Sequence, residues 1–78
     1  MTPETRRDLE AYLAQRSAGR YETTLTYDAE SRYVTVSGVS VAGGVRREVS
    51  HSTEFRGPAD VRAVRSAIDH VVGVLSRP

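Results

Sequence analysis

The sequence contains no cysteine, no lysine and no asparagine, and these absences narrow the kind of protein it encodes. Without cysteine, neither disulfide bonds nor thiolate metal ligands can hold the fold together. No apolar run approaches the roughly 20 residues that a membrane-spanning helix needs. The opening Met1-Thr2-Pro3-Glu4 does not begin a basic and then apolar secretory leader. We therefore expect a cytoplasmic protein with no membrane segment.

The charged residues are numerous but balanced. All 11 basic residues are arginines, and 10 acidic residues reduce the formal net charge to +1. A guanidinium group binds phosphate through paired hydrogen bonds, so an arginine-only set could serve nucleic-acid binding. Strong phosphate binders carry an excess of positive charge, however, and this chain does not. We attribute the missing lysine and asparagine, and the single isoleucine (Ile68), to a GC-rich genome of bacterial or phage origin.

The length of the chain suits one small domain. We expect residues 1–78 to form it as a single unit. Hydrophobic residues make up 38% and charged residues 27% of the chain, which is typical of globular and not of disordered proteins. A chain of this size buries only about 60% of its unfolded surface, so the core should be thin.

A first helix is predicted over about residues 3–18. Thr2 can cap the free N–H groups, and Pro3 suits the first helical position. Gly19 stands where a left-handed residue commonly ends a helix. Helical spacing gives this segment a short apolar stripe, which consists of Leu9, Tyr12, Leu13 and the stem of Arg16.

Three antiparallel strands are predicted over about residues 20–28, 32–42 and 45–56, because the apolar period changes to two. A two-residue Gly43-Gly44 loop pairs Ala42 with Val45. A four-residue loop over 29–32 pairs Tyr27 with Val34. Both registers put the same apolar side chains on one face of a meander of order 1-2-3: Leu25, Tyr27, Val34, Val36, Val45, Val49 and Phe55.

A second helix is predicted over about residues 58–76, with Pro58 at its first position and Asp60 in its first turn. Its apolar stripe consists of Val61, Val64, Ile68, Val71, Val72 and Leu75, and its outward residues are Arg62, Arg65, Ser66, Asp69 and Gly73. Both helices should pack on the apolar face of the sheet. The prediction is therefore an α+β fold of αβββα order.

The sequence offers no convincing arrangement for catalysis. Asp69 and His70 are adjacent in a helix and point about 100° apart, so they cannot act as an orienting acid and a base. Glu48 and Glu54 are roughly 20 Å apart along one strand, too far for paired acid–base work. We expect a protein that is not an enzyme and has no catalytic residue.

Metal and cofactor binding are not expected either. The two histidines lie 19 positions apart, and no further ligand accompanies them. His51 falls on the inner face of its strand, where we expect a half-buried imidazole hydrogen-bonded to a neighbour. We predict no metal site and no cofactor.

The outer face of the predicted sheet is the leading candidate for partner binding. If both helices cover the other face, exposed apolar side chains would lie here among hydroxyls and balanced charge. The candidate contacts are Tyr33, Thr35, Val39, Val41, Arg46 and Glu48. The alternative is an ordinary solvated face whose β-branched residues serve strand formation.

These features predict a small protein-interaction domain that acts as an inhibitor, adaptor or regulatory subunit of a larger protein. Phages and mobile elements encode short proteins of this type, including inhibitors of defence complexes. A strand edge is a second route to a partner, or to a homodimer. The third strand looks guarded by its charges at 46–48 and 54, whereas the first strand looks less protected.

The order helix, three strands, helix resembles the double-stranded RNA-binding domain over nearly the whole chain. Leu9-Glu10 and Gln15 are loosely similar to that family's minor-groove helix. The resemblance implies RNA contacts from Gln15, Arg16, Arg20, Arg62 and Arg65. The loop at 28–31 is acidic and the second helix lacks that family's lysine cluster, so nucleic-acid binding is the alternative hypothesis.

Overall fold

The computed structural model describes residues 1–77 and has the predicted α+β architecture. Its elements are α1 (Pro3–Ser17), β1 (Glu22–Asp28), β2 (Tyr33–Ala42), β3 (Val45–Glu54), a 3-10 turn (Pro58–Asp60) and α2 (Val61–Leu75). The last helix therefore begins three residues later than the sequence suggested. Asp60 accounts for part of this difference, because its carboxylate accepts the Arg56 N–H at 2.7 Å and holds a turn there.

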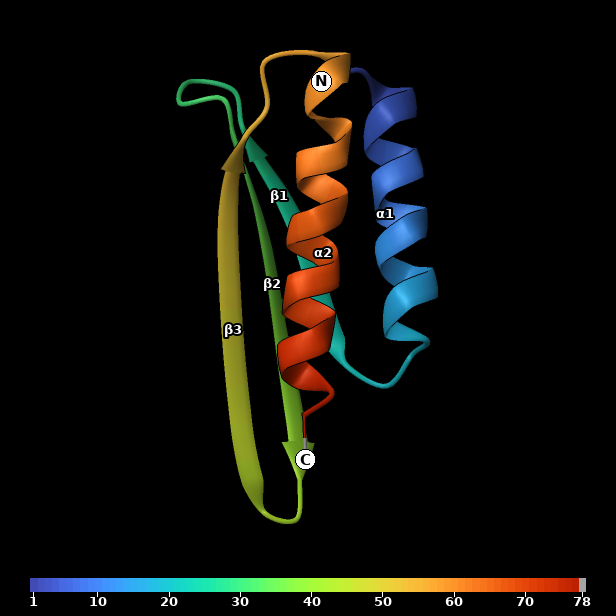
Figure 1. The fold of residues 1–78 in the computed structure, drawn as a ribbon, viewed down its shortest axis with the longest axis vertical. Helices are drawn as coiled ribbons and strands as arrows, with labels where there is room; N and C mark the ends of the chain where they lie inside the picture. The colour runs from blue at the N-terminus through green and yellow to red at the C-terminus, as the bar shows by residue number, and fades with distance from the viewer. Residues whose placement is uncertain (78) are drawn as a thin grey trace.

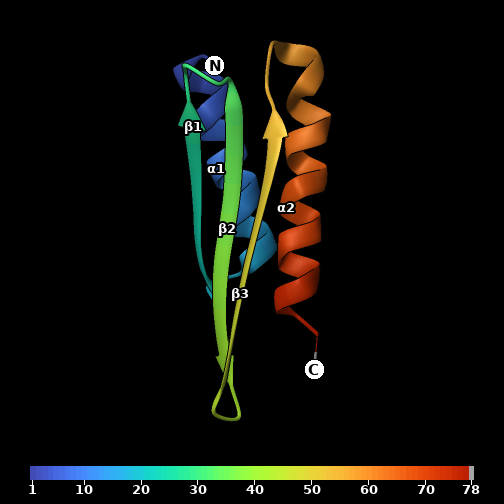
Figure 2. The ribbon, with the colours of Figure 1, turned by 90° about the vertical axis from the view of Figure 1, so that its left-hand side faces the viewer.

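The sheet is an antiparallel meander of order β1-β2-β3, and both predicted registers are confirmed. Ala42 pairs with Val45 across the Gly43-Gly44 loop, and Tyr27 pairs with Val34 across the first loop. Both helices lie on one face of this sheet, as Figures 1 and 2 show. The opposite face carries no element among residues 1–77.

The core lies between the sheet and the helices. The sheet contributes Leu25, Val34, Val36 and Phe55; α1 contributes Leu9 and Leu13; and α2 contributes Val64, Ala67, Ile68, Val71, Val72 and Leu75. Both predicted helix stripes thus supply the core, and Ala67 joins that of α2. No helix among residues 1–77 is long and apolar enough to cross a membrane.

One predicted core residue is wrong. Val45 falls on the same face of the sheet as Val34, but it is 63% exposed. The β2–β3 hairpin extends past the C-terminal end of α2 (Figure 1), so nothing covers that face at the tip. Strand length explains this, because ten residues of β2 rise about 33 Å. The fifteen residues of α2 rise only about 22 Å.

The two helices run side by side in the same direction (Figure 1), and polar side chains join them around Asp69. Tyr12 Oη donates a hydrogen bond to Asp69 Oδ1 at 2.8 Å. Arg16 Nε donates to the same oxygen at 3.0 Å, and the Arg65 guanidinium lies 5.4 Å from the centroid of the Tyr12 ring. Asp69 therefore faces α1 and does not point outward as predicted.

Candidate functional site

The uncovered face of the sheet carries two rows of hydroxyl groups across its centre. The register places Thr24, Ser37 and Ser50 in one row. It places Thr26, Thr35 and Ser52 in the next, and the hydroxyls of Thr35 and Ser52 lie 2.9 Å apart. This face is turned toward the viewer in Figure 2. Its middle is polar and carries only the short side chains of serine and threonine.

This hydroxyl belt divides the predicted partner-binding residues into two groups. Tyr33, 44% exposed, begins β2, and Val41, 70% exposed, lies close to its end. Eight residues of extended chain separate them by about 27 Å. The structure thus brings Val39 and Val41 together but leaves Tyr33 at the far end, while Thr35 is half-buried in the belt.

Charge surrounds the Val39 and Val41 end of the face. Val39 lies between Glu22 of β1 and Glu48 of β3. Val41 lies opposite Arg46, and the Arg46 guanidinium forms an exposed ion pair with Glu48. This end has the small apolar centre and charged rim of a protein-contact surface.

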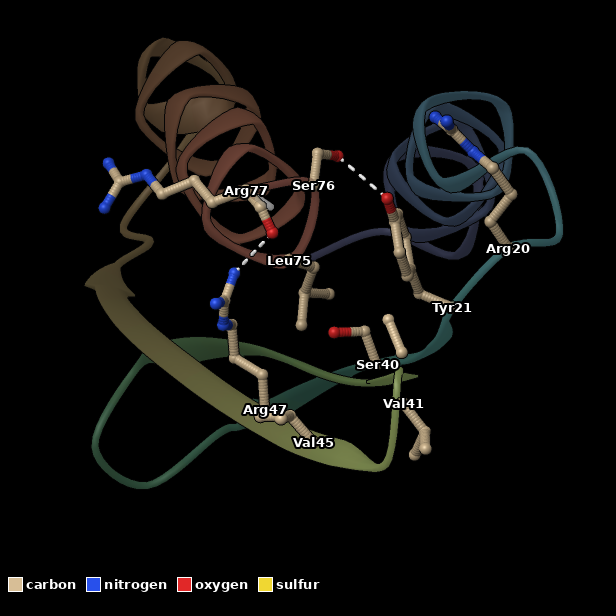
Figure 3. Close-up of a pocket in the computed structure, with 10 residues that line it drawn as sticks. Arg20, Tyr21, Ser40, Val41, Val45, Arg47, Leu75, Ser76 and Arg77 are labelled. Carbon is tan, nitrogen blue, oxygen red and sulfur yellow. Dashed lines mark hydrogen bonds between the residues drawn. The ribbon is translucent and has the colours of Figure 1, made fainter.

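A groove of about 430 Å³ opens on the other side of the same hairpin, where it outruns α2. Its walls come from the α1–β1 loop, the hairpin and the last turn of α2, as Figure 3 shows. They are formed by Arg20, Tyr21, Ser40, Val41, Ala42, Val45, Arg47, Leu75, Ser76 and Arg77. Two of the three most exposed large apolar side chains of residues 1–77, Val41 and Val45, thus line one groove.

Hydrogen bonds hold two sides of this groove. The hydroxyls of Tyr21 and Ser76 lie 3.0 Å apart. Arg47 Nη1 donates to the carbonyls of Val74 at 3.1 Å and Arg77 at 2.7 Å, so its positive charge caps the negative end of α2. Figure 3 draws two of these bonds as dashed lines near Leu75, one between Arg47 and Arg77 and one between Tyr21 and Ser76.

The groove has basic and apolar walls. Arg20, Arg47 and Arg77 line it, and none of its lining residues is acidic. The guanidinium of Arg47 points into the groove, whereas those of Arg20 and Arg77 point away from it toward the solvent at its rim (Figure 3). The Arg20 guanidinium lies over the ring of Tyr21, 5.4 Å from its centroid. A side chain that combines an apolar stem with a carboxylate, or an apolar residue next to an acidic one, would match these walls.

Residue spacing did not predict this groove, although the lengths of the elements indicate part of it. Val45 was assigned to the core and Arg47 to the guard of an edge, yet both line the groove. The predicted lengths already differ in this direction, because eleven residues of strand (32–42) rise about 36 Å and nineteen residues of helix (58–76) rise about 28 Å. The pairing of Tyr21 with Ser76 depends on how the last turn of α2 packs, which residue spacing does not give.

The two histidines are neighbours in space. The rings of His51 on β3 and His70 on α2 have centroids 5.2 Å apart. His51 is exposed and not half-buried as predicted, because β3 is the outermost strand. Two imidazoles are fewer than the three or four protein ligands that zinc takes. No group of three or more His, Cys, Asp or Glu residues gathers within residues 1–77.

The residues suggested by the RNA-binding resemblance are spread along the helices. Gln15 and Arg16 lie near the end of α1, and Arg16 is paired with Asp69. Arg62 lies in the first turn of α2. Because α1 and α2 run in the same direction (Figure 1), Arg20, which follows α1, lies at the opposite end of the molecule from Arg62.

The strand edges differ from the prediction. On β1, which looked less protected, Arg6 Nη2 of α1 donates to the Leu25 carbonyl at 3.3 Å and occupies one backbone group of that edge. On β3 the ion pairs Arg46–Glu48 and Arg56–Glu54 stand at the two ends of the strand and leave its centre free of them.

Comparison of the chain with protein-family models, with curated proteins and with solved structures finds no match. The surfaces described above are therefore the basis for assigning a function.

Proposed function

We propose that this protein is a small cytoplasmic interaction domain that docks on a larger protein through the projecting β2–β3 hairpin. It acts by occupying a surface of its partner, as an inhibitor, adaptor or regulatory subunit does, and it catalyses no reaction. Inhibitors of defence complexes encoded by phages and mobile elements belong to this class.

One observation carries the proposal: the hairpin exposes Val41 on one face at 70% and Val45 on the other at 63%. In the monomer these two valines favour strand formation but contribute little through burial, because most of each side chain lies in water. Burial of both side chains in a complex would contribute about 1.5–3 kcal/mol each, which is enough to anchor an interface.

The charges next to these valines suggest the chemistry of the partner. Arg20 and Arg77 stand at the rim of the groove, which no acidic residue lines. Arg46 stands beside Val41 on the outer face. A partner segment that carries acidic residues around an aliphatic or aromatic side chain would complement both sides.

The test is an affinity pull-down from nuclease-treated lysate of the native host, with the partner identified by mass spectrometry. Val41→Glu should abolish capture of the partner. Thr26→Glu is the matched control, since Thr26 is exposed on the same face but lies in the hydroxyl belt on β1. Capture that survives Val41→Glu and is lost with Thr26→Glu would contradict the assignment to the hairpin. Capture that disappears with nuclease would favour nucleic-acid binding.

A further inference from the structure

The free edge of β3 has an alternating pattern of backbone groups. In the Gly43-Gly44 hairpin, Ala42 and Val45 form a hydrogen-bonded pair, so the odd-numbered residues of β3 direct their N–H and C=O groups toward β2. The bond from Phe55 N–H to the Arg32 carbonyl at 2.7 Å continues this pattern. The even-numbered residues from Arg46 to Glu54 therefore direct their backbone groups away from the sheet.

The side chains along this edge leave its centre accessible. The arginine and glutamate pairs stand at the ends, at Arg46–Glu48 and Glu54–Arg56. The segment 49–53 between them is Val-Ser-His-Ser-Thr and contains no acidic residue and no arginine. At the edge of β1 the Arg6 side chain donates a hydrogen bond to a backbone carbonyl. Within residues 1–77, no side chain forms such a hydrogen bond with the outward backbone groups of β3.

The side of α2 that lies next to this edge is also free of charge. His70 of α2 contacts His51 of β3, and the Val74 carbonyl of α2 accepts a hydrogen bond from Arg47 of β3. His70 and Val74 therefore mark the side of α2 that faces β3. The exposed Ala63 falls on it at helical spacing, seven residues before His70. Its small side chain would let a second helix come close.

We propose that β3 pairs antiparallel with β3 of a second copy of this chain, about a twofold axis through Ser50. The result is a six-stranded sheet with all four helices on one face. This pairing satisfies the outward backbone groups of every even-numbered residue of β3. It leaves the outer face open, so it is independent of the function proposed for the hairpin.

Charge selects this register. With Ser50 opposite Ser50 of the second copy, Arg46 lies opposite Glu54 of the second copy, and symmetry makes this attractive pair twice. A register centred on His51 would instead set Glu48 opposite Glu54 of the second copy, and Arg46 opposite Arg56. A register centred on Val49 would set Arg46 opposite Ser52 and leave Glu54 opposite Gly44. Of these three axes, only the one through Ser50 sets opposite charges face to face. Axes through Arg47 or Ser52 would also do so, but the first overlaps only residues 45–49 and the second uses Arg56, beyond the end of β3.

Charge reversal tests the register by sedimentation equilibrium. The native chain should show a reversible dimer. Arg46→Glu or Glu54→Arg alone should weaken dimerisation about tenfold or more, since each makes two like-charge pairs. The double variant should restore it. Because that variant also breaks both intrachain ion pairs, recovery can come only from pairing between copies. A native chain that stays monomeric at millimolar concentration would overturn the proposal, as would a double variant no better than the singles.

Single cysteines test the axis directly, since the native chain has none. Ser50→Cys should cross-link to a dimer with a short thiol-reactive linker, because residue 50 faces itself. Ser52→Cys is the matched control; its thiol would face Glu48 of the second copy and should cross-link poorly. Equal cross-linking at both positions, or faster cross-linking at residue 52, would contradict the axis through Ser50.

Discussion

Tyr12 and Asp69, 57 positions apart in the chain, join the two helices through a hydrogen bond of 2.8 Å from the phenol to the carboxylate. This bond raises the pKa of Tyr12 above its ordinary value near 10, because ionisation would remove the donated proton; burial and the charge of Asp69 act in the same direction. The link between α1 and α2 is therefore sensitive to alkaline pH.

A raised pKa in the folded state means that the stabilisation is complete below about pH 10 and is lost as pH rises through the folded-state value. We expect the native chain to melt at a higher temperature than Tyr12→Phe between pH 7 and 9, with a constant difference. Above about pH 10 the difference should shrink. Melting curves of both proteins test this, because the two proteins differ at residue 12 alone. A difference that grows with pH would contradict the assignment.

The end of α1 contains a residue in a strained conformation. Ala18 has φ 52° and ψ 32°, in the left-handed region that residues with a Cβ rarely adopt, and Gly19 follows at φ 71°. The left-handed region costs an L-residue about 1–2 kcal/mol. Ala18→Gly relieves this cost but gains flexibility in the unfolded state, so we expect a net stabilisation of about 0.5–1 kcal/mol.

Chemical denaturation would measure this change. Ala14→Gly serves as the control, since Ala14 is exposed within the same helix and has helical geometry. It should lose about 1 kcal/mol. If Ala18→Gly destabilises the protein as much as Ala14→Gly does, the left-handed conformation of Ala18 carries no strain.

Much of the sheet could be predicted from the sequence because the two loops restrict the pairing independently. The Gly43-Gly44 loop and the loop over 29–32 each fix one register, and the apolar residues of all three strands must then agree. Side-chain parity gives the face on which a residue lies but not whether that face is covered. This is why Val45 was placed correctly on a face and wrongly in the core.

The contacts between layers could not be predicted from spacing. The approach of His51 to His70 and of Asp69 to Tyr12 depends on the rotation of α2 about its axis and its position across the sheet. These follow from the packing of the whole core. The open groove beside Leu75 follows from element lengths, but its arginine lining again depends on how the last turn of α2 lies over the hairpin.

Gly38 of β2 is a point of close approach between α2 and the sheet. A Cβ built there would lie 2.5 Å from Leu75 Cδ1 and 3.4 Å from Val71 Cγ1. Gly38→Ala should force Leu75 to move and destabilise the protein by about 1–3 kcal/mol, as overpacking does. A smaller side chain at position 75 should relieve part of this, so Gly38→Ala combined with Leu75→Val should be less destabilised than the sum of the two changes.

Gly73 is the matched control for that substitution. A Cβ at Gly73 would meet nothing within 4 Å, and the residue lies on the exposed side of α2. Gly73→Ala should therefore stabilise the helix by about 1 kcal/mol. Opposite signs for the two glycine substitutions, measured by urea denaturation, are the expected result; equal effects would show that α2 does not press on β2 at Gly38.

The nucleic-acid alternative makes a prediction of its own. Arg62 and Arg65 together with Arg16 and Arg20 would have to contact phosphate, so binding should fall steeply with salt and weaken in the Arg62→Ala, Arg65→Ala double variant. We expect no retardation of double-stranded RNA or DNA in a low-salt gel shift, because Asp69 pairs with Arg16 and ten acidic residues offset the arginines. Retardation that this double variant abolishes would favour the alternative over protein docking.

The hairpin makes the sharpest prediction about partner binding, since its two valines can be changed without harm to the fold. Val41 and Val45 are 70% and 63% exposed, so Val41→Glu and Val45→Glu should each change the free energy of unfolding by less than about 0.5 kcal/mol. Each should nonetheless weaken binding to the captured partner at least about tenfold, because a carboxylate would be buried in the interface.

Arg20→Glu should weaken binding more at low salt than at high salt if the partner is acidic. Isothermal titration with the purified partner measures all three changes. Val41 projects from the outer face and only borders the groove. Loss of binding with Val41→Glu alone would therefore place the contact on the outer face, whereas loss with Val45→Glu alone would confine it to the groove.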